Sequence, residues 1–311
     1  MKDSSPAFSR PLRILFTIAR GDSFGGSSLH ILDMANRLKQ DGHEVEILIG
    51  GTPTEEVPRR YAAAGLHFRC IESMGRHIHP LQDFRAIREL RKHFIEFQPD
   101  LISLHSSKAG ALGRLAAIGL NCPVLYTPHC WSFVEGFRKA WLYRWIEKRL
   151  APLAAKIITV SEDERTFALQ SGVSHCDQLV TIHNGVRDRF PQGTPAREEN
   201  DATRMIMVAR FEEQKNQKLL IRALHRLGHL SWDLTLVGDG PFREECEVLS
   251  KSLGLSDRIH FKGYCSDIPG LLVEHDLFLL ITAGRDFPEA PSKPWELDSL
   301  PSFRMSVAVE R

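Results

Sequence analysis

Two cations form the clearest chemical pattern in this 311-residue chain. Arg210 directly follows an apolar run of strand length, and Lys215 comes five residues later, just before a segment of helical period. Parallel α/β sheets bind ligands at the carboxyl ends of their strands, so both side chains are expected there. A diphosphate would satisfy the planar fork of the arginine and the point charge of the lysine. On spacing alone, a solvated charge pair offset by Glu212 and Glu213 remains the alternative.

Glycine-rich turns accompany two of the expected strand ends. Gly25 and Gly26 lie between the first strand and a helix, and Gly238 and Gly240 follow a strand in the second half. Glycine lets a ligand approach the backbone, and the free N–H groups of a helix start suit a phosphate or carboxylate. Each turn is equally compatible with a purely structural role.

Two of the fourteen histidines also follow strand-like runs. His105 comes after Leu101–Leu104 and leads toward Lys108, while His129 comes shortly after Val124–Thr127. At the carboxyl edge of a sheet, a neutral imidazole can hydrogen-bond a substrate. The alternative for both histidines is a packing or surface role.

Composition excludes several classes of protein. Forty basic and thirty-nine acidic residues give a net charge of +1, so no global field favours nucleic acid. The six cysteines form no C-x-x-C pair, and the sequence contains no Asp-x-Asp, G-x-S-x-G or Walker A motif, so we expect no metal and no cofactor. No apolar run approaches the ~20 residues that span a bilayer. We expect a cytoplasmic location.

Short apolar runs alternate with segments of helical period, which predicts an α/β fold with parallel sheets covered on both faces. The first-half strands are expected at Ile14–Ile18, Val45–Ile49, Leu101–Leu104, Val124–Thr127 and Ile157–Val160, with helices at Ser28–Asp41 and Asp83–Phe97. The second-half strands are expected at Met205–Val208, Leu234–Val237, Ile259–Lys262 and Leu277–Ile281, with helices at Lys218–Leu227 and Pro241–Leu253.

This order predicts two domains joined by a polar linker. We expect a first domain over 1–186, a linker over 187–204, a second and partial domain over 205–281, and a proline-rich tail over 282–311. Prolines at close spacing forbid a regular helix over Ala283–Pro301, so the αβ rhythm is expected to stop there.

One segment suggests a membrane surface. Residues 137–150, FRKAWLYRWIEKRL, combine two tryptophans with five basic side chains at helical spacing. Such a helix could lie on the inner face of a membrane as a peripheral contact. The alternative is a helix packed beside the sheet with its basic face in water.

A series of motifs resembles the family-four retaining glycosyltransferases of GT-B architecture over roughly Arg13–Ile281. The motifs are, in order, GGSSLHILDMANRLKQDGHEVEILIGG, LHSSKAGALGRLAA, TPHCWSF, IITVSEDER, IHNGV, VARFEEQKNQKLLIRAL, LVGDGP and IHFKGYCSDIPGLL. The resemblance implies two Rossmann-like domains facing a cleft, a hexosyltransferase-type activity without a metal, a nucleotide-sugar donor and a glycan or lipid-linked acceptor. Polysaccharide or lipopolysaccharide biosynthesis is the implied context.

The resemblance also assigns roles to residues. Arg210 and Lys215 look like the clamp on the donor diphosphate, and His129 resembles the histidine near the transferred sugar. The implied donor-binding glycines are Gly25, Gly26, Gly238 and Gly240, and the implied acceptor or cleft residues are His105, Lys108 and Asn184.

The tail departs from the family pattern, which continues as E-G-x-P, L-E-A-M and G-x-P-V-V-x-S-x-x-G-G. The residues from Gly284 onward can be encoded by a DNA sequence that also carries the family pattern in another reading frame. When the first two bases of that DNA sequence are skipped, it encodes EGLPGSPLEAMGAGLPAIVSDVGG. The sequence therefore predicts a frameshift that truncates the second domain, exposes an apolar sheet edge and leaves little or no transfer activity. Sequencing the gene from the codon of Leu280 to that of Arg311 tests this.

Two other functions remain open at this stage. A sugar-nucleotide epimerase of GT-B fold would form product without an acceptor. A non-catalytic remnant would bind nucleotide without turnover.

Overall fold

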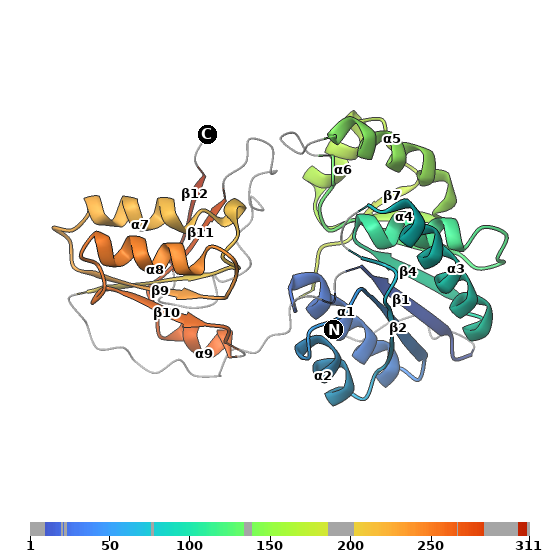
Figure 1. Ribbon diagram of the computed structural model, residues 1–311, viewed down its shortest axis with the longest axis horizontal. Helices are drawn as coiled ribbons and strands as arrows, with labels where there is room; N and C mark the ends of the chain where they lie inside the picture. Colours follow the sequence, from blue (N-terminus) through green and yellow to red (C-terminus); the bar gives the residue numbers. More distant parts are fainter. Residues whose placement is uncertain are drawn as a thin grey trace, which may run out of the picture. The chain divides into compact units, whose positions relative to one another are not determined.

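The computed structural model of the protein describes residues 10–19, 21, 24–75, 78–133, 139–185, 202–265 and 267–282 and the backbone of 304–309. The chain divides into two compact units, Met1–Gly185 and Val186–Arg311 (Figure 1). Most of the expected linker and the stretch 283–303 of the expected tail lie outside the described residues.

The first unit is a parallel seven-stranded sheet in the order β3-β2-β1-β4-β5-β6-β7. Its strands are β1 (Arg13–Ile18), β2 (Glu44–Gly50), β3 (His67–Ile71), β4 (Leu101–His105), β5 (Val124–Thr127), β6 (Lys156–Thr159) and β7 (Leu179–Thr181). Its helices are α1 (Gly26–Gln40), α2 (Glu56–Ala63), α3 (Pro80–Phe97), α4 (Ser107–Ala116), α5 (Ala140–Leu150), α6 (Glu162–Gln170) and the 3-10 turn η1 (Ala151–Leu153).

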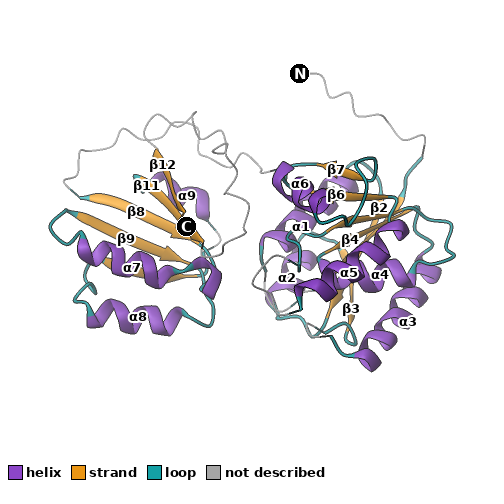
Figure 2. Ribbon diagram, turned by 90° about the horizontal axis from the view of Figure 1, so that it is seen from above, coloured by secondary structure: helices purple, strands orange, loops and turns teal. Residues whose placement is uncertain are grey.

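Both faces of this sheet are buried from solvent because helices cover each of them (Figure 2). Along β1, Leu15 belongs to one apolar cluster and Phe16 to the other, and Leu48 and Ile47 alternate in the same way on β2. A strand that is buried on both sides has no polar face, which explains why apolar residues dominate Ile14–Ile18 of β1 and Ile47–Ile49 of β2.

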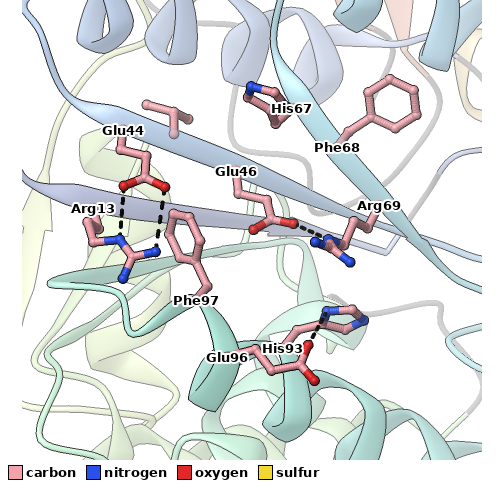
Figure 3. A pocket seen from close by; sticks show the side chains of 10 residues that line it. Arg13, Glu44, Glu46, His67, Phe68, Arg69, His93, Glu96 and Phe97 are labelled. Carbon is pink, nitrogen blue, oxygen red and sulfur yellow. Dashed lines mark hydrogen bonds and ion pairs between the residues drawn. The ribbon is translucent and has the colours of Figure 1, made fainter.

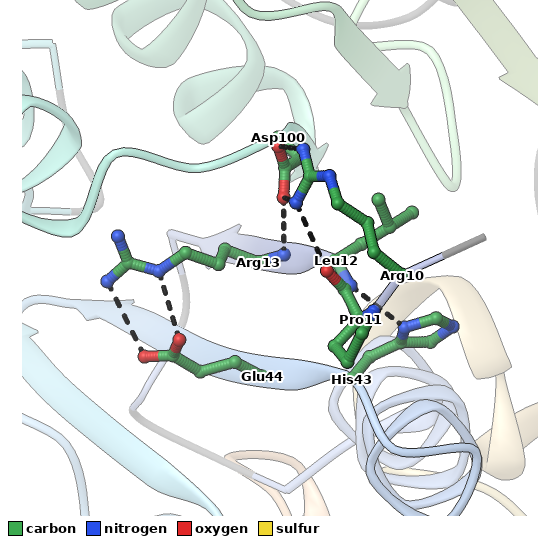
Figure 4. A network of polar contacts seen from close by, with 7 residues as sticks. All are labelled: Arg10, Pro11, Leu12, Arg13, His43, Glu44 and Asp100. Atoms are coloured by element: carbon green, nitrogen blue, oxygen red, sulfur yellow. Dashed lines mark hydrogen bonds and ion pairs between the residues drawn. The ribbon is translucent and has the colours of Figure 1, made fainter. Parts of the chain in front are cut away.

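Polar contacts fix the amino ends of the central strands (Figure 4). Asp100, just before β4, accepts hydrogen bonds from the guanidinium of Arg10 and from the backbone N–H of Arg13, the latter at 2.8 Å. The guanidinium of Arg13 lies 3.0 Å from Glu44 at the start of β2. These contacts hold the register of three neighbouring strands at the edge remote from their carboxyl ends.

The second unit is a parallel five-stranded sheet in the order β10-β9-β8-β11-β12. Its strands are β8 (Thr203–Val208), β9 (Trp232–Val237), β10 (Ile259–Gly263), β11 (Leu277–Thr282) and β12 (Arg304–Val309). Its helices are the 3-10 turn η2 (Glu213–Lys215), α7 (Gln217–Arg226), α8 (Arg243–Ser252) and α9 (Ile268–Val273).

The predicted fold class, α/β with two Rossmann-like parallel sheets, is confirmed. One expectation is corrected: β12 pairs with β11 along its whole length, so the edge of β11 that was expected to be open is occupied. Among the described helices, none is long and apolar enough to cross a bilayer.

Candidate functional site

Three histidines meet at the carboxyl edge of the first sheet. His105 ends β4 and is 1% exposed. Its Nδ1 lies 2.9 Å from Nε2 of His129, which follows the neighbouring strand β5, and its Nε2 lies 2.9 Å from Oγ of Ser103. The structure therefore brings together two predicted site residues that are 24 positions apart in the chain.

The third histidine, His30, was not predicted. It lies on α1, and its ring centroid is 6.0 Å from that of His105 and 5.5 Å from that of His129. The spacing of His30 from the glycine-rich loop could have pointed to it. His30 follows Gly26 by four residues and so lies one turn into the helix that starts at that loop.

Burial keeps this histidine cluster (His30, His105 and His129) neutral. Loss of solvent, reinforced by the neighbouring histidines, lowers the pKa of His105 well below its usual value and that of His129 to about 4. Loss of solvent also lowers the pKa of His30, although the charge of Asp33 acts in the opposite direction. The cluster can therefore act near neutral pH by hydrogen bonding rather than by charge.

Backbone strain lies beside the same cluster. His129 has φ 59°, and Ser106, directly after His105, has φ 75° and ψ 156°, a region that side chains other than glycine rarely occupy. The N–H of Ser106 donates to the carbonyl of Thr127 at 3.0 Å, which ties the ends of β4 and β5 together. Strain of about 1–3 kcal/mol per residue persists where the surroundings enforce it, typically at functional sites.

The predicted phosphate loop opens α1. Gly25 is the N-cap without a side-chain cap, its φ of −113° is ordinary, and a Cβ added at Gly25 or Gly26 would meet nothing within 4 Å. Neither packing nor backbone conformation therefore requires glycine at these positions. Glycine at both positions would still allow a ligand to approach the backbone at the start of the helix closely.

Lys108 and Asn184 are not brought into the histidine cluster. The ammonium of Lys108 lies 2.6 Å from the carboxylate of Asp83 on α3, so this cation already has a partner. Asn184 follows β7, two strands away from β5, and its buried Oδ1 has no hydrogen-bond partner among the described residues. Their assignment to the acceptor side stays a prediction.

In the second unit, the predicted cations lie on the loop between β8 and α7. Arg210 comes two residues after β8, and its carbonyl accepts a hydrogen bond from Nε2 of Gln217 at 2.8 Å. Its guanidinium lies 3.2 Å from Glu212, with both side chains about one-third exposed. Lys215 ends η2 and is half-buried. The expected Glu212 contact is thus present, and an anion would compete with it for Arg210.

Gly238 and Gly240 pack closely against the backbone of this loop. A Cβ at Gly238 would lie 2.2 Å from the carbonyl oxygen of Ala209, and one at Gly240 would lie 2.5 Å from that of Phe211. The N–H of Phe211 donates to the carbonyl of Asp239 at 3.0 Å. The missing side chain of each glycine therefore leaves room for the backbone on either side of Arg210. The two glycines thus have a structural role, because they position that arginine.

A cavity of about 520 Å³ lies at the other edge of the first sheet, beside the starts of β1, β2 and β3 and the end of α3 (Figure 3). Its ionisable side chains contact one another, as Arg13 with Glu44, Arg69 with Glu46, and His93 with Glu96. It is remote from the strand ends at which α/β sheets bind ligands, so we do not place the site there. Within the described residues, no group of three or more His, Cys, Asp or Glu is arranged to hold a metal ion.

Two parallel α/β units, one with a glycine-rich strand-to-helix loop and one with a cationic loop after its first strand, are typical of nucleotide-binding proteins with Rossmann-like domains. The sequence model of the glycosyl transferase 4-like domain matches residues 25–185, more than half of the chain, and that of the glycosyl transferases group 1 matches residues 192–283. The chain belongs to the group 1 glycosyltransferases. This family gives the epimerase alternative no support.

Similar proteins come from several bacteria. The EpsD protein of Bacillus subtilis is 30% identical over 210 residues, which cover 61% of this chain and 55% of EpsD. An Escherichia coli UDP-Gal:alpha-D-GlcNAc-diphosphoundecaprenol alpha-1,3-galactosyltransferase is 26% identical over 71% of this chain and 61% of that enzyme. The chain thus spans less than two-thirds of the length of both relatives.

Solved structures share the fold. The Anabaena protein Alr3699/HepE, crystallised with UDP and glucose, matches with a TM-score of 0.72 at 20% identity, covering 87% of this chain and 74% of that one. The lipopolysaccharide outer core galactosyltransferase WaaB matches with a TM-score of 0.62 at 19% identity, covering 88% and 74%. At this identity the likeness establishes the architecture of the chain.

Proposed function

We propose that this protein transfers a sugar from a nucleotide-sugar donor to a lipid-linked or polysaccharide acceptor, with retention of configuration and without a metal. The observation that carries the proposal is the loop of Arg210 and Lys215, which follows the first strand of the unit matched by the group 1 glycosyltransferases. Two cations at that edge can neutralise the diphosphate that leaves during transfer.

The donor side combines charge with a rigid backbone. Arg210 offers a planar fork for two phosphate oxygens, and Lys215 adds a point charge. Gly238 and Gly240 hold the backbone on either side of Arg210, so the guanidinium is placed before the donor arrives. Each charge-assisted contact contributes about 1.5–3 kcal/mol.

The first unit supplies neutral groups for the sugar and the acceptor. We place His129 beside the transferred sugar, Gly25 and Gly26 beneath the donor phosphates, and His105 and Lys108 near the acceptor, with Asn184 as a further candidate. The low pKa of His129 supports a hydrogen-bonding role, because the ring stays neutral near pH 7.

The acceptor class follows from relatives whose printed names specify lipid-linked or lipopolysaccharide substrates. A protein acting on such an acceptor from the cytoplasm benefits from contact with the membrane surface, and α5 supports such a contact. Trp141 is 68% and Trp145 54% exposed, and Arg144, Lys148 and Arg149 are exposed on the same helix. Glu147, which is buried in the carboxyl-terminal half of α5, lies 2.6 Å from Arg114 of α4 and fixes the helix to the unit.

The membrane contact predicts binding to anionic vesicles. The Trp141→Ala, Trp145→Ala double variant should reduce binding to phosphatidylglycerol vesicles at least 10-fold, because interfacial tryptophans and basic side chains supply the attraction. A Leu81→Ala, Phe84→Ala variant, which removes exposed apolar residues from α3, serves as the matched control. Equal binding by both variants and the wild type would contradict the contact through α5.

Incubation of the full chain with a panel of nucleotide sugars and polyprenyl-diphosphate glycan acceptors tests the activity. The frameshift stays a prediction and would leave transfer slow, so we expect at most a low rate of nucleoside diphosphate release, which depends on the acceptor and is lost in Arg210→Ala. Donor binding without acceptor-dependent release would instead favour the non-catalytic nucleotide-binding alternative.

A further inference from the structure

The hydrogen bonds of the histidine cluster have a direction. Neutral His105 carries one ring N–H, so it donates through one nitrogen and accepts through the other. Its Nε2 contacts the hydroxyl of Ser103, and its Nδ1 contacts Nε2 of His129. The proton positions of Ser103, His105 and His129 are therefore coupled.

The environment of Ser103 decides that direction. Ser103 is 6% exposed, and within the described part of the chain His105 is the partner of its hydroxyl. If the hydroxyl accepted from His105, its own O–H would be a buried donor without an acceptor, which costs more than an unused lone pair. The hydroxyl therefore donates to Nε2 of His105, and His105 carries its proton on Nδ1.

We propose that His105 is a positioning residue that fixes the proton of His129 on Nδ1. With Nε2 of His129 accepting from His105, the ring of His129 presents Nδ1–H as a hydrogen-bond donor to the substrate. Burial of His105 and the aromatic contact of its ring with Phe16, at 5.6 Å between centroids, keep the ring in this orientation. The catalytic consequence of this arrangement rests on the proposed function, whereas the tautomer itself does not.

Two substitutions separate this role from simple packing. The side-chain amide of asparagine can replace Nδ1 of a histidine, and that of glutamine can replace Nε2. His105→Asn therefore keeps a donor toward His129, while His105→Gln keeps only the contact with Ser103. Both variants introduce an amide at the same buried position, so each controls for the cost of the change.

Nitrogen NMR of the full chain, labelled on histidine and assigned with a His129→Asn variant, reads the tautomer directly. We expect Nδ1–H for His129 in the wild type and in His105→Asn, and a mixture of tautomers in His105→Gln. Protonation of His129 on Nε2 in the wild type, or identical His129 spectra in the two variants, would overturn the inference.

Kinetics then separates the inference from the proposed function. With an active donor and acceptor, His105→Gln should lower kcat about 10-fold with little change in donor KM, and His105→Asn should recover most of the loss. Equal losses in both variants would overturn the role in catalysis. Absence of transfer in the wild type, with the Nδ1–H tautomer present, would contradict the proposed function and leave the positioning by His105 intact.

Discussion

The histidine cluster of the first unit and the cationic loop of the second unit, which carries Arg210 and Lys215, differ in charge and in burial. His105 is buried, hydrogen-bonded through both ring nitrogens and held neutral by loss of solvent. Arg210 and Glu212 remain about one-third exposed, so their charges keep much of their hydration. A reaction that expels a diphosphate needs charge at the leaving group and oriented neutral donors at the sugar. Under the proposed function, these two tasks fall to different units.

The largest effect is expected from removing the cations. The Arg210→Ala, Lys215→Ala double variant should lower kcat/KM for transfer by about 10²–10⁴-fold, because two charge-assisted contacts of about 1.5–3 kcal/mol each are lost. Lys251→Ala, at the far end of α8, is the matched control and should leave the rate unchanged. Equal rates for the double variant and this control would refute the clamp.

A backbone substitution tests how the cationic loop is built. Gly238→Ala should lower the free energy of unfolding of the second unit by about 3 kcal/mol, since its Cβ would lie 2.2 Å from the carbonyl oxygen of Ala209. Gly254→Ala is the control, because it has φ +69° but open space around its Cβ, and should cost about 1 kcal/mol. Denaturant titration measures both, and a smaller loss for Gly238→Ala than for Gly254→Ala would contradict the packing argument.

Acid should weaken the first unit through its histidines. The pKa of His129 is about 4 in the folded chain and about 6.5 when unfolded, so the unfolded state binds more protons between these values. The stability due to this depressed pKa is complete above pH 6.5 and is lost as the pH falls toward 4, with about 2 kcal/mol gone at pH 5.

Hydrogen exchange by mass spectrometry at pH 7.5 and 5, corrected for intrinsic exchange rates, should show this loss in peptides of β4 and β5. His129→Asn removes one of the three titrating rings and should reduce the dependence, while His30 and His105 keep part of it. A wild-type dependence no larger than that of His129→Asn would contradict a buried neutral His129.

The smallest effect is expected from removing the carboxylate of Glu212, which competes with the donor phosphates for Arg210. Glu212→Gln removes the carboxylate that lies 3.2 Å from Arg210, and an exposed pair of this kind is worth about 0.2–1 kcal/mol. Donor affinity should rise about 2–5-fold, measured by calorimetry. Unchanged or weaker binding would show that Glu212 does not compete with the phosphates.

Sequence alone predicted the repeating αβ order, because the central strands are buried on both faces and are therefore mostly apolar. It missed β3, whose residues His67 and Arg69 interrupt the apolar pattern at the edge of the sheet. It also missed β12, which follows a proline-rich stretch. Strands at a sheet edge have one neighbour and need less apolar surface, so composition marks them weakly.

The candidate site was predictable only in part. The motifs identified His105, His129 and Arg210, because each follows a strand. His30 was missed because its proximity to the other two rings depends on how α1 packs beside β1 and β4, which no local pattern encodes. The role of Gly238 likewise depends on a contact between two loops about thirty residues apart in sequence.

Nucleoside diphosphate binding, measured by calorimetry on the full chain, tests the division of labour most directly. The measurement compares the wild type, Arg210→Ala and His129→Gln with UDP, GDP and ADP. We predict that one nucleotide binds the wild type, that Arg210→Ala weakens its binding at least 10-fold, and that His129→Gln changes it less than 3-fold. Equal binding of that nucleotide by Arg210→Ala and the wild type, or a loss confined to His129→Gln, would contradict the account.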